Sequence, residues 1–126
     1  MDKGLIQTEQ APKAIGCYSQ AIRAGNWVFL SGQIGLKPDL MQIVEGGVRA
    51  QLEQIMLNMK AVLAKAGGDL SHIVKQTVFL VDMAHFALVN EVMMGHFSMP
   101  FPARSAVQVS ALPLGALVEI EAIAVI

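Results

Sequence analysis

The segment from residue 48 to residue 66 constrains the fold most, because it predicts one long amphipathic helix. Its apolar residues recur every three or four positions and form a single stripe: Val48, Leu52, Ile55, Met56, Met59, Val62, Leu63 and Ala66. The charged residues of the segment lie off this stripe, and Gly67-Gly68 supplies a stop. A helix of this kind packs on one side only, so the rest of the chain must supply a surface that covers the stripe.

Strand patterns before and after this helix predict that the covering surface is a β-sheet. Residues 19–23 and 27–31 are joined at Gly25-Asn26 as a hairpin, and residues 74–81 are rich in β-branched and aromatic side chains. A second helix is expected over about 84–97, capped by Asp82. The order strand, strand, helix, strand, helix, strand, strand predicts a single α+β domain over residues 1–126, with two helices on one face of a mixed sheet.

The two terminal strands surround a turn at Leu112-Pro113-Leu114-Gly115 and differ from ordinary core strands. The even positions of the last strand are all apolar and suit the helix-covered face: Val118, Ile120, Ala122 and Ala124. Its odd positions mix apolar residues with Glu119 and Glu121. A mixed face suggests burial against another subunit, with the carboxylates at a cleft.

The composition also points to a subunit interface. The chain is 54% hydrophobic and only 15% charged, yet no apolar stretch approaches the ~18 residues of a membrane span. We therefore expect the excess apolar surface to meet another protein subunit and not a membrane.

Charge and cysteine content limit the partners and the compartment. The net charge is −1 and no cluster of basic residues stands out, so nucleic acid is an unlikely main partner. The single cysteine, Cys17, excludes an internal disulfide, and the N-terminal residues lack the apolar core of a secretory signal. These features predict a cytoplasmic protein.

Two ionisable residues in the terminal strands are the main candidates for chemistry. If the strands adjoin, Arg104 and Glu119 could bind a small carboxylic acid and activate a water beside it. The alternative for Arg104 is a structural ion pair with Glu119 or Glu121. Burial of Glu119 would raise its pKa and suit it for proton transfer. The alternative is a strand carboxylate that pairs with a neighbouring lysine or arginine.

Other residues allow both a functional and a structural interpretation. Tyr18, at the start of a strand, either reaches a ligand or bonds to the backbone. Gly32 either permits close approach to a ligand or marks a β-bulge, and Asn90 either contacts a ligand or bonds to a loop. Cys17 lacks an activating base and is expected to be a buried, inert thiol, and the three histidines form no metal-binding spacing with cysteine or carboxylates.

Together these segments resemble the reactive intermediate deaminase family, also called RidA or YjgF. The resemblance covers nearly the whole chain and rests on these motifs: Ala11-Pro12-Lys13-Ala14-Ile15-Gly16-Cys17-Tyr18-Ser19-Gln20-Ala21, Ser31-Gly32-Gln33-Ile34, Val74-Lys75-Gln76-Thr77-Val78, Val89-Asn90, Pro102-Ala103-Arg104-Ser105, Leu112-Pro113 and Val118-Glu119-Ile120-Glu121-Ala122-Ile123-Ala124. The resemblance implies a chorismate-mutase-like fold and a homotrimer with clefts between subunits. It also implies hydrolysis of 2-imino acids, such as 2-iminobutanoate and 2-iminopropanoate, to 2-oxo acids and ammonia without a metal or cofactor.

By position, the resemblance gives Arg104 the role of binding the substrate carboxylate and Glu119 that of holding the attacking water. The backbone amide of Ala106 matches a donor to the substrate. The positions that match the lining of the cleft are Tyr18, Gly32 and Asn90.

The chain departs from the family pattern at three positions. Many members have cysteine in place of Ala106, proline in place of Cys17 and an aromatic residue in place of Met93. Ala106 removes thiol chemistry but keeps a backbone donor, so the deaminase interpretation stands while the substrate range stays open. Two other functions stay open as well: a ribonuclease or translation inhibitor, and a non-enzymatic ligand-sensing or chaperone-like trimer.

Overall fold

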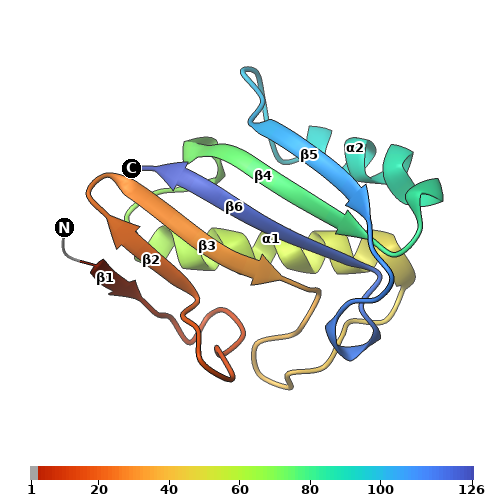
Figure 1. Ribbon diagram of the computed structural model, residues 1–126, viewed down its shortest axis with the longest axis horizontal. Helices are drawn as coiled ribbons and strands as arrows, with labels where there is room; N and C mark the ends of the chain where they lie inside the picture. The colour runs from red at the N-terminus through yellow and green to blue at the C-terminus, as the bar shows by residue number, and fades with distance from the viewer. Residues whose placement is uncertain (1–2) are drawn as a thin grey trace.

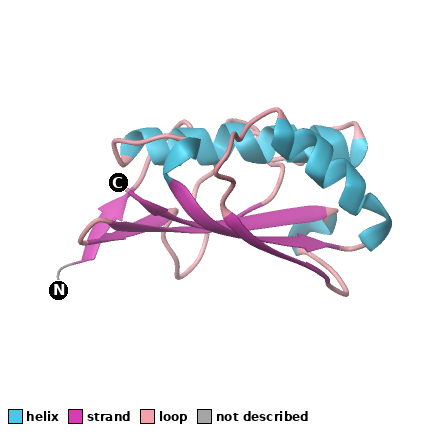
Figure 2. Ribbon diagram, turned by 90° about the horizontal axis from the view of Figure 1, so that it is seen from above, coloured by secondary structure: helices cyan, strands magenta, loops and turns pink. Residues whose placement is uncertain are grey.

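One six-stranded sheet forms one layer of the molecule and two helices form the other, in a computed structural model that describes residues 3–126 (Figure 1). The elements in chain order are β1 (Lys3–Ile6), β2 (Ala21–Ala24), β3 (Trp27–Gln33), α1 (Gly47–Lys65), β4 (Ile73–Leu80), α2 (Phe86–Met94), β5 (Ala103–Gln108) and β6 (Val118–Val125). Helices α1 and α2 lie on the same face of the sheet, and neither of them covers the opposite face (Figure 2). The α+β prediction, with two helices on one face, is confirmed.

The strand order is β1-β2-β3-β6-β4-β5, and every neighbouring pair is antiparallel except β4 and β5. The expectation that the two terminal strands adjoin is therefore wrong, because β4 lies between β5 and β6. The physical reason is the connection through α2, which crosses over the sheet and lets β5 pair with β4 in parallel. The chain then returns and places β6 on the other side of β4.

The core lies between α1 and the sheet, as the apolar stripe predicted. The side chains that α1 buries include Leu52, Ile55, Met56, Met59 and Leu63. Burial of an aliphatic side chain of this size stabilises a fold by roughly 1.5–3 kcal/mol. The even positions of β6 are buried and its odd positions are only partly buried or exposed, which confirms the predicted alternation.

Several predicted boundaries differ from the structure. Strand β1 was not predicted, because its four residues are mostly exposed and lack an apolar pattern. The second helix is shorter than expected: Asp82 caps a short 3-10 turn (Met83–His85), and α2 follows and ends at Met94. The turn before β6 contains another 3-10 segment, Pro113–Gly115.

The face of the sheet that carries no helix exposes large apolar side chains. Trp27 and Phe29 stack with ring centroids 6.5 Å apart, and they are 49% and 44% exposed. Val107 of β5 is also exposed. Apolar surface of this kind marks interaction sites in proteins, as the predicted subunit interface requires. Within residues 3–126, no helix is long and apolar enough to cross a membrane.

Candidate functional site

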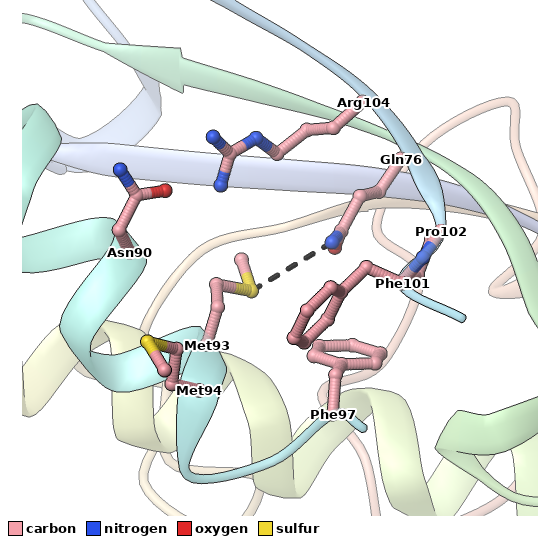
Figure 3. Close-up of a pocket in the computed structure, with 8 residues that line it drawn as sticks. All are labelled: Gln76, Asn90, Met93, Met94, Phe97, Phe101, Pro102 and Arg104. Atoms are coloured by element: carbon pink, nitrogen blue, oxygen red, sulfur yellow. Dashed lines mark hydrogen bonds between the residues drawn. The ribbon is translucent and has the colours of Figure 1, made fainter. Parts of the chain in front are cut away.

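Two separate pockets divide the predicted site residues. The first, the Arg104 pocket, has a volume of about 520 Å³ and is lined mainly by Gln76, Asn90, Met93, Phe97, Phe101 and Arg104 (Figure 3). The second, the Glu119 pocket, has a volume of about 300 Å³ and is lined by residues that include Lys13, Tyr18, Gly32, Met41, Leu114 and Glu119. Asn90 thus lies with Arg104, whereas Tyr18 and Gly32 lie with Glu119.

The register of the sheet places Arg104 and Glu119 on opposite faces. Arg104 lies beside Gln76 of β4, whose buried side chain contacts α2, so Arg104 is on the helix-covered face. Glu119 lies beside Phe79 of β4, one position out of phase with the buried residues, and so is on the face without helices. Because the two pockets open on opposite faces of one sheet, one copy of the chain does not bring these two residues together.

The guanidinium of Arg104 lies over an aromatic ring and has no acidic partner. Its Cζ atom is 5.1 Å from the centroid of the Phe86 ring at the start of α2, which is a cation–π contact. Among the salt bridges within residues 3–126, none involves Arg104, so the alternative of an ion pair with Glu119 or Glu121 is wrong. In Figure 3 the guanidinium extends toward the side of the pocket from which Asn90 projects, and its donors are available to a carboxylate.

Gln76 is a site residue that the sequence analysis missed. Its side chain is 3% exposed, its Nε2 donates to Met93 Sδ at 3.7 Å, and its Oε1 has no hydrogen-bond partner. A buried acceptor without a partner costs roughly 1–3 kcal/mol, which singles this amide out in the wall of the pocket. The available signal was a polar residue at an even position of β4, in phase with the core positions Val78 and Leu80.

Glu119 is a half-buried carboxyl group with a perturbed pKa. Burial raises the pKa of Glu119, and the negative charge of Glu121 on the same face raises it further. A carboxyl group with a raised pKa is better matched to proton transfer near neutral pH than an ordinary glutamate. The predicted pairing of Glu119 with a neighbouring base does not occur among the salt bridges of residues 3–126.

Gly32 makes room for this carboxyl group. A Cβ atom at residue 32 would lie 2.9 Å from Cδ of Glu119 and 3.0 Å from its Oε2, closer than carbon atoms normally approach. The register between β3 and β6 also shifts between Leu30 and Gln33, as in a β-bulge. The bulge and the close approach therefore occur at the same glycine, and the group that approaches is the side chain of Glu119.

A loop held by Gln20 forms another wall of the Glu119 pocket. The buried Gln20 amide accepts from the N–H of Thr8 at 2.7 Å and donates to the carbonyls of Thr8 and Pro12 at 3.0 and 2.8 Å. Tyr18 lies in this loop and not in a strand, and its hydroxyl accepts from the N–H of Ile15 at 3.2 Å. The backbone interpretation of Tyr18 is thus correct, and the exposed ring still lines the pocket. Gln20 was not recognised in the sequence as the residue that holds this loop.

Two apolar residues of the Glu119 pocket adopt left-handed backbone conformations. Met41 has φ 54° and Leu114 has φ 57°, values that residues other than glycine, asparagine and aspartate rarely take. Leu114 is 71% exposed, so burial of its side chain does not offset the strain. Strain of this kind often persists beside functional sites, and here both strained residues line the pocket of the carboxyl group.

The predicted backbone donor at Ala106 lies on the edge strand of the sheet. The N–H of Val109 donates to the carbonyl of Leu80 on β4. Because alternate residues of a strand turn their N–H groups to opposite sides, the N–H of Ala106 turns away from β4, toward the unpaired edge of β5. This amide is therefore placed to donate to a ligand or to another chain.

The remaining candidates have structural roles or none. Cys17 is exposed, so the expectation of a buried thiol is wrong; it lies in the loop before β2, outside the packed core. His72 accepts from the N–H of Asp69 at 3.0 Å, and His96 contacts Glu53 at 2.8 Å. Within residues 3–126, no group of three or more histidine, cysteine or acidic residues is arranged to hold a metal ion.

Comparisons with known proteins identify the family of the chain. Residues 8–126 match the family model described as Endoribonuclease L-PSP. Protein DfrA of Myxococcus xanthus is 56% identical over 99% of this chain and 97% of its own length. The 2-iminobutanoate/2-iminopropanoate deaminase of Mus musculus is 48% identical over 96% of this chain and 90% of its own.

A solved structure gives the same result at the level of the fold. The crystal structure of RidA from an Antarctic Psychrobacter species superimposes with a TM-score of 0.95 at 50% identity, over 98% of this chain and 99% of that one. Sequence and structure thus agree over nearly the whole length, and the chain belongs to the reactive intermediate deaminase (RidA/YjgF) family.

Proposed function

We propose that this protein hydrolyses 2-imino acids, among them 2-iminobutanoate and 2-iminopropanoate, to 2-oxo acids and ammonia. A relative that is 48% identical to this chain is named 2-iminobutanoate/2-iminopropanoate deaminase, and this name supports the reaction class. The single observation that carries the proposal further is the separation of an unpaired Arg104 and a half-buried Glu119 into two pockets on opposite faces of one sheet. Each pocket has one of the two charges that the reaction needs.

The two pockets have complementary roles in the proposed reaction. Arg104 binds the substrate carboxylate through two parallel hydrogen bonds, and the free N–H of Ala106 adds a third donor. Glu119 orients a water molecule, which adds its oxygen to the electrophilic imine carbon while its proton passes to the carboxylate. Glu119 passes this proton to the imine nitrogen, which gives a tetrahedral adduct with a hydroxyl and an amino group on one carbon. Glu119 then takes the hydroxyl proton as the 2-oxo group forms, the carbon–nitrogen bond breaks and the departing nitrogen receives that proton, so ammonia leaves and the carboxylate is restored. Tyr18, Gly32 and Asn90 line the space around the substrate.

Completion of the site requires a second copy of the chain. A homotrimer in which the Arg104 pocket of one subunit faces the Glu119 pocket of the next would provide three identical sites. The exposed apolar side chains of Trp27, Phe29 and Val107 on the uncovered face support an assembly of this kind. Positioning of a bound imine and a water in one geometry can lower a barrier by several kcal/mol.

A subunit-mixing experiment tests both the activity and the shared site. The imine is generated by a dehydratase, semicarbazide traps what remains, and 2-oxo acid formation is followed with increasing amounts of protein. Arg104→Ala and Glu119→Gln are each expected to be inactive. Co-expressed as mixed oligomers, the two variants should recover about a quarter of wild-type activity, because one interface in four then combines an intact Arg104 with an intact Glu119.

Two outcomes contradict the proposal. If mixed oligomers that contain both variants recover no activity, the site does not lie between subunits. If the wild-type protein binds 2-oxo acids but does not accelerate imine hydrolysis, the cleft serves ligand sensing and not catalysis.

The description of the family model names a second candidate, endoribonuclease activity. The charge gives it little support, because the net charge is −1 and no cluster of basic residues stands out in the sequence. Cleavage of a labelled RNA that persists at moderate salt and is lost in Glu119→Gln would establish this second activity.

A further inference from the structure

We infer that Gln76 is a positioning residue for Arg104: its unpartnered Oε1 accepts the Nε–H of Arg104 when a carboxylate ligand binds. This inference rests on the proposed function, because it assumes that Arg104 binds the carboxylate of the ligand. It concerns a residue of β4 that does not itself touch the ligand.

The first observation is the orientation of a buried amide. Gln76 is almost completely buried, and its Nε2 faces the thioether sulfur of Met93, an acceptor only (Figure 3). This contact fixes which end of the amide is the donor, so Oε1 is left as an acceptor at the wall of the pocket without a partner. Buried acceptors without a partner are rare in folded proteins, and one beside a cation needs an explanation.

The second observation is the register of the two parallel strands. Gln76 and Arg104 are direct partners across β4 and β5, so their side chains leave the same face side by side and line the same pocket. The guanidinium of Arg104 lies over the ring of Phe86 and has no salt bridge within residues 3–126. The Oε1 of Gln76, an acceptor without a donor, thus lies on the strand beside Arg104, whose N–H donors have no carboxylate partner among residues 3–126.

The geometry of the guanidinium makes this pairing useful. Its five N–H groups form a planar fork, and a carboxylate bonds to two of them in parallel. If Nε–H is held by Gln76, the edge formed by the two Nη atoms is left to face the ligand in one orientation. Phe86 restricts the plane of the fork and Gln76 its rotation within that plane, so Gln76 acts on ligand affinity more than on the chemical step.

The test uses the full-length protein with two variants that remove the acceptor, Gln76→Leu and Gln76→Met. Either substitution replaces a buried amide, whose Oε1 has no partner and whose Nε2 bonds only to a sulfur atom, with an apolar side chain of similar size, so neither should lower the melting temperature. Three quantities are measured: the Kd for 2-oxobutanoate by titration calorimetry, kcat and KM in the imine assay, and the Nε–H signal of Arg104 by ¹⁵N NMR with and without 2-oxobutanoate.

The expected result is a rise of about tenfold in Kd and KM, the size of one hydrogen bond to a charged group, with a smaller change in kcat. In the wild-type protein, 2-oxobutanoate should slow the solvent exchange of the Arg104 Nε–H, and this protection should be lost in both variants. If one variant does not fold, the other gives the same measurements, and the wild-type NMR experiment stands without either.

Two results would overturn the inference alone. These are a Kd unchanged in a folded variant, or an Arg104 Nε–H that 2-oxobutanoate protects equally in the variants and the wild type. The failure of the proposed function looks different, because then Arg104→Ala would bind 2-oxobutanoate as the wild type does. Loss of binding in Arg104→Ala together with normal binding in Gln76→Leu retains the proposed function and removes Gln76 from it.

Discussion

The Arg104 pocket and the Glu119 pocket lie on opposite faces of one sheet and differ in the charged group that each provides, an arginine in the first and a glutamate in the second. Arg104 is a permanent cation that has an aromatic ring beneath it and no anion nearby. Glu119 is a carboxyl group whose negative form is disfavoured by burial and by Glu121. Among residues 3–126, those that line the Arg104 pocket include no carboxylate and those that line the Glu119 pocket include no arginine, a difference that fits the proposal of one site shared between two copies of the chain.

The two pockets also differ in how the backbone builds them. Most residues that line the Arg104 pocket lie on regular elements, with Gln76 on β4, Arg104 on β5 and Asn90 on α2. The loop between α2 and β5 adds Phe97, Phe101 and Pro102. The Glu119 pocket is formed mainly by loops. Hydrogen bonds of Gln20 hold one of these loops, and two others contain the left-handed residues Met41 and Leu114. We therefore expect substitutions in the first pocket to act through ligand contacts and those in the second to act largely through loop geometry.

The strongest test removes one charge from each pocket. Arg104→Ala and Glu119→Gln should each reduce imine hydrolysis by about a hundredfold or more, because the first loses carboxylate binding and the second loses the base. Arg49→Ala, which removes a surface arginine paired with Glu91, is the matched control and should retain activity. Coupled assays measure the imine hydrolysis of each variant, and circular dichroism checks that it is folded. Full activity in a folded Arg104→Ala protein would show that the reaction does not need the cation of the first pocket.

The next effect in size concerns the space beside the carboxyl group. Gly32→Ala places a methyl group 2.9 Å from Cδ of Glu119, so the carboxyl must shift and activity should fall by roughly tenfold to a hundredfold. Gly4→Ala is the control, because a Cβ atom there meets its neighbours at ordinary contact distance, 3.5 Å. Affinity for a 2-oxo acid should change less than kcat in Gly32→Ala. An unchanged kcat would show that the position of Glu119 does not matter for the reaction.

The raised pKa of Glu119 predicts a pH dependence of activity and of stability. Activity should rise as pH increases through that pKa, and Glu121→Gln, which removes the second cause, should move this rise to lower pH. The pKa of Glu119 is higher in the folded state than in the unfolded state, so the folded state binds more protons at pH values between the two. The free energy of unfolding therefore falls as the pH rises through this range. Glu119→Gln should therefore be at least as stable as the wild type at pH 7.

Rate–pH profiles and thermal melts at several pH values check these two effects. Glu53→Gln serves as a control for a glutamate outside both pockets, although it also removes a contact with His96. If Glu121→Gln does not shift the acid limb of the rate–pH profile, that limb reports the titration of a group other than Glu119.

The smallest expected effect tests the strain of the Glu119 pocket. Leu114→Asn should raise the free energy of unfolding by up to about 1 kcal/mol, because asparagine tolerates the left-handed conformation better than leucine does. Leu5→Asn, at an exposed leucine of strand β1, is the control and should give no such gain. Denaturant unfolding measures the difference. A stabilised variant with reduced activity would indicate that the strained leucine serves the pocket, whereas lower stability would mean that its side chain matters more than its backbone.

Sequence patterns predicted the regular elements better than their arrangement. The helix at 48–66 and the alternation in the last strand were correct because periodicity reports directly which side chains share a face. The position of β4 between β5 and β6 was missed, because strands that follow one another along the chain are often, but not always, neighbours in a sheet. Strand β1 was missed because a short edge strand has no buried face to impose a pattern.

The candidate site divides in the same way. The sequence by itself determined the chemical groups that are available, because residue type fixes charge, donors and acceptors, and it predicted these candidate residues: Arg104, Glu119, Tyr18, Gly32 and Asn90. Only the tertiary structure decided that these residues lie in two pockets on opposite faces, that Gln76 lines one of them and that Gln20 holds a loop of the other. The physical reason is that burial, register and hydrogen-bond partners depend on strand pairings between residues far apart in the chain, and local patterns do not encode those pairings.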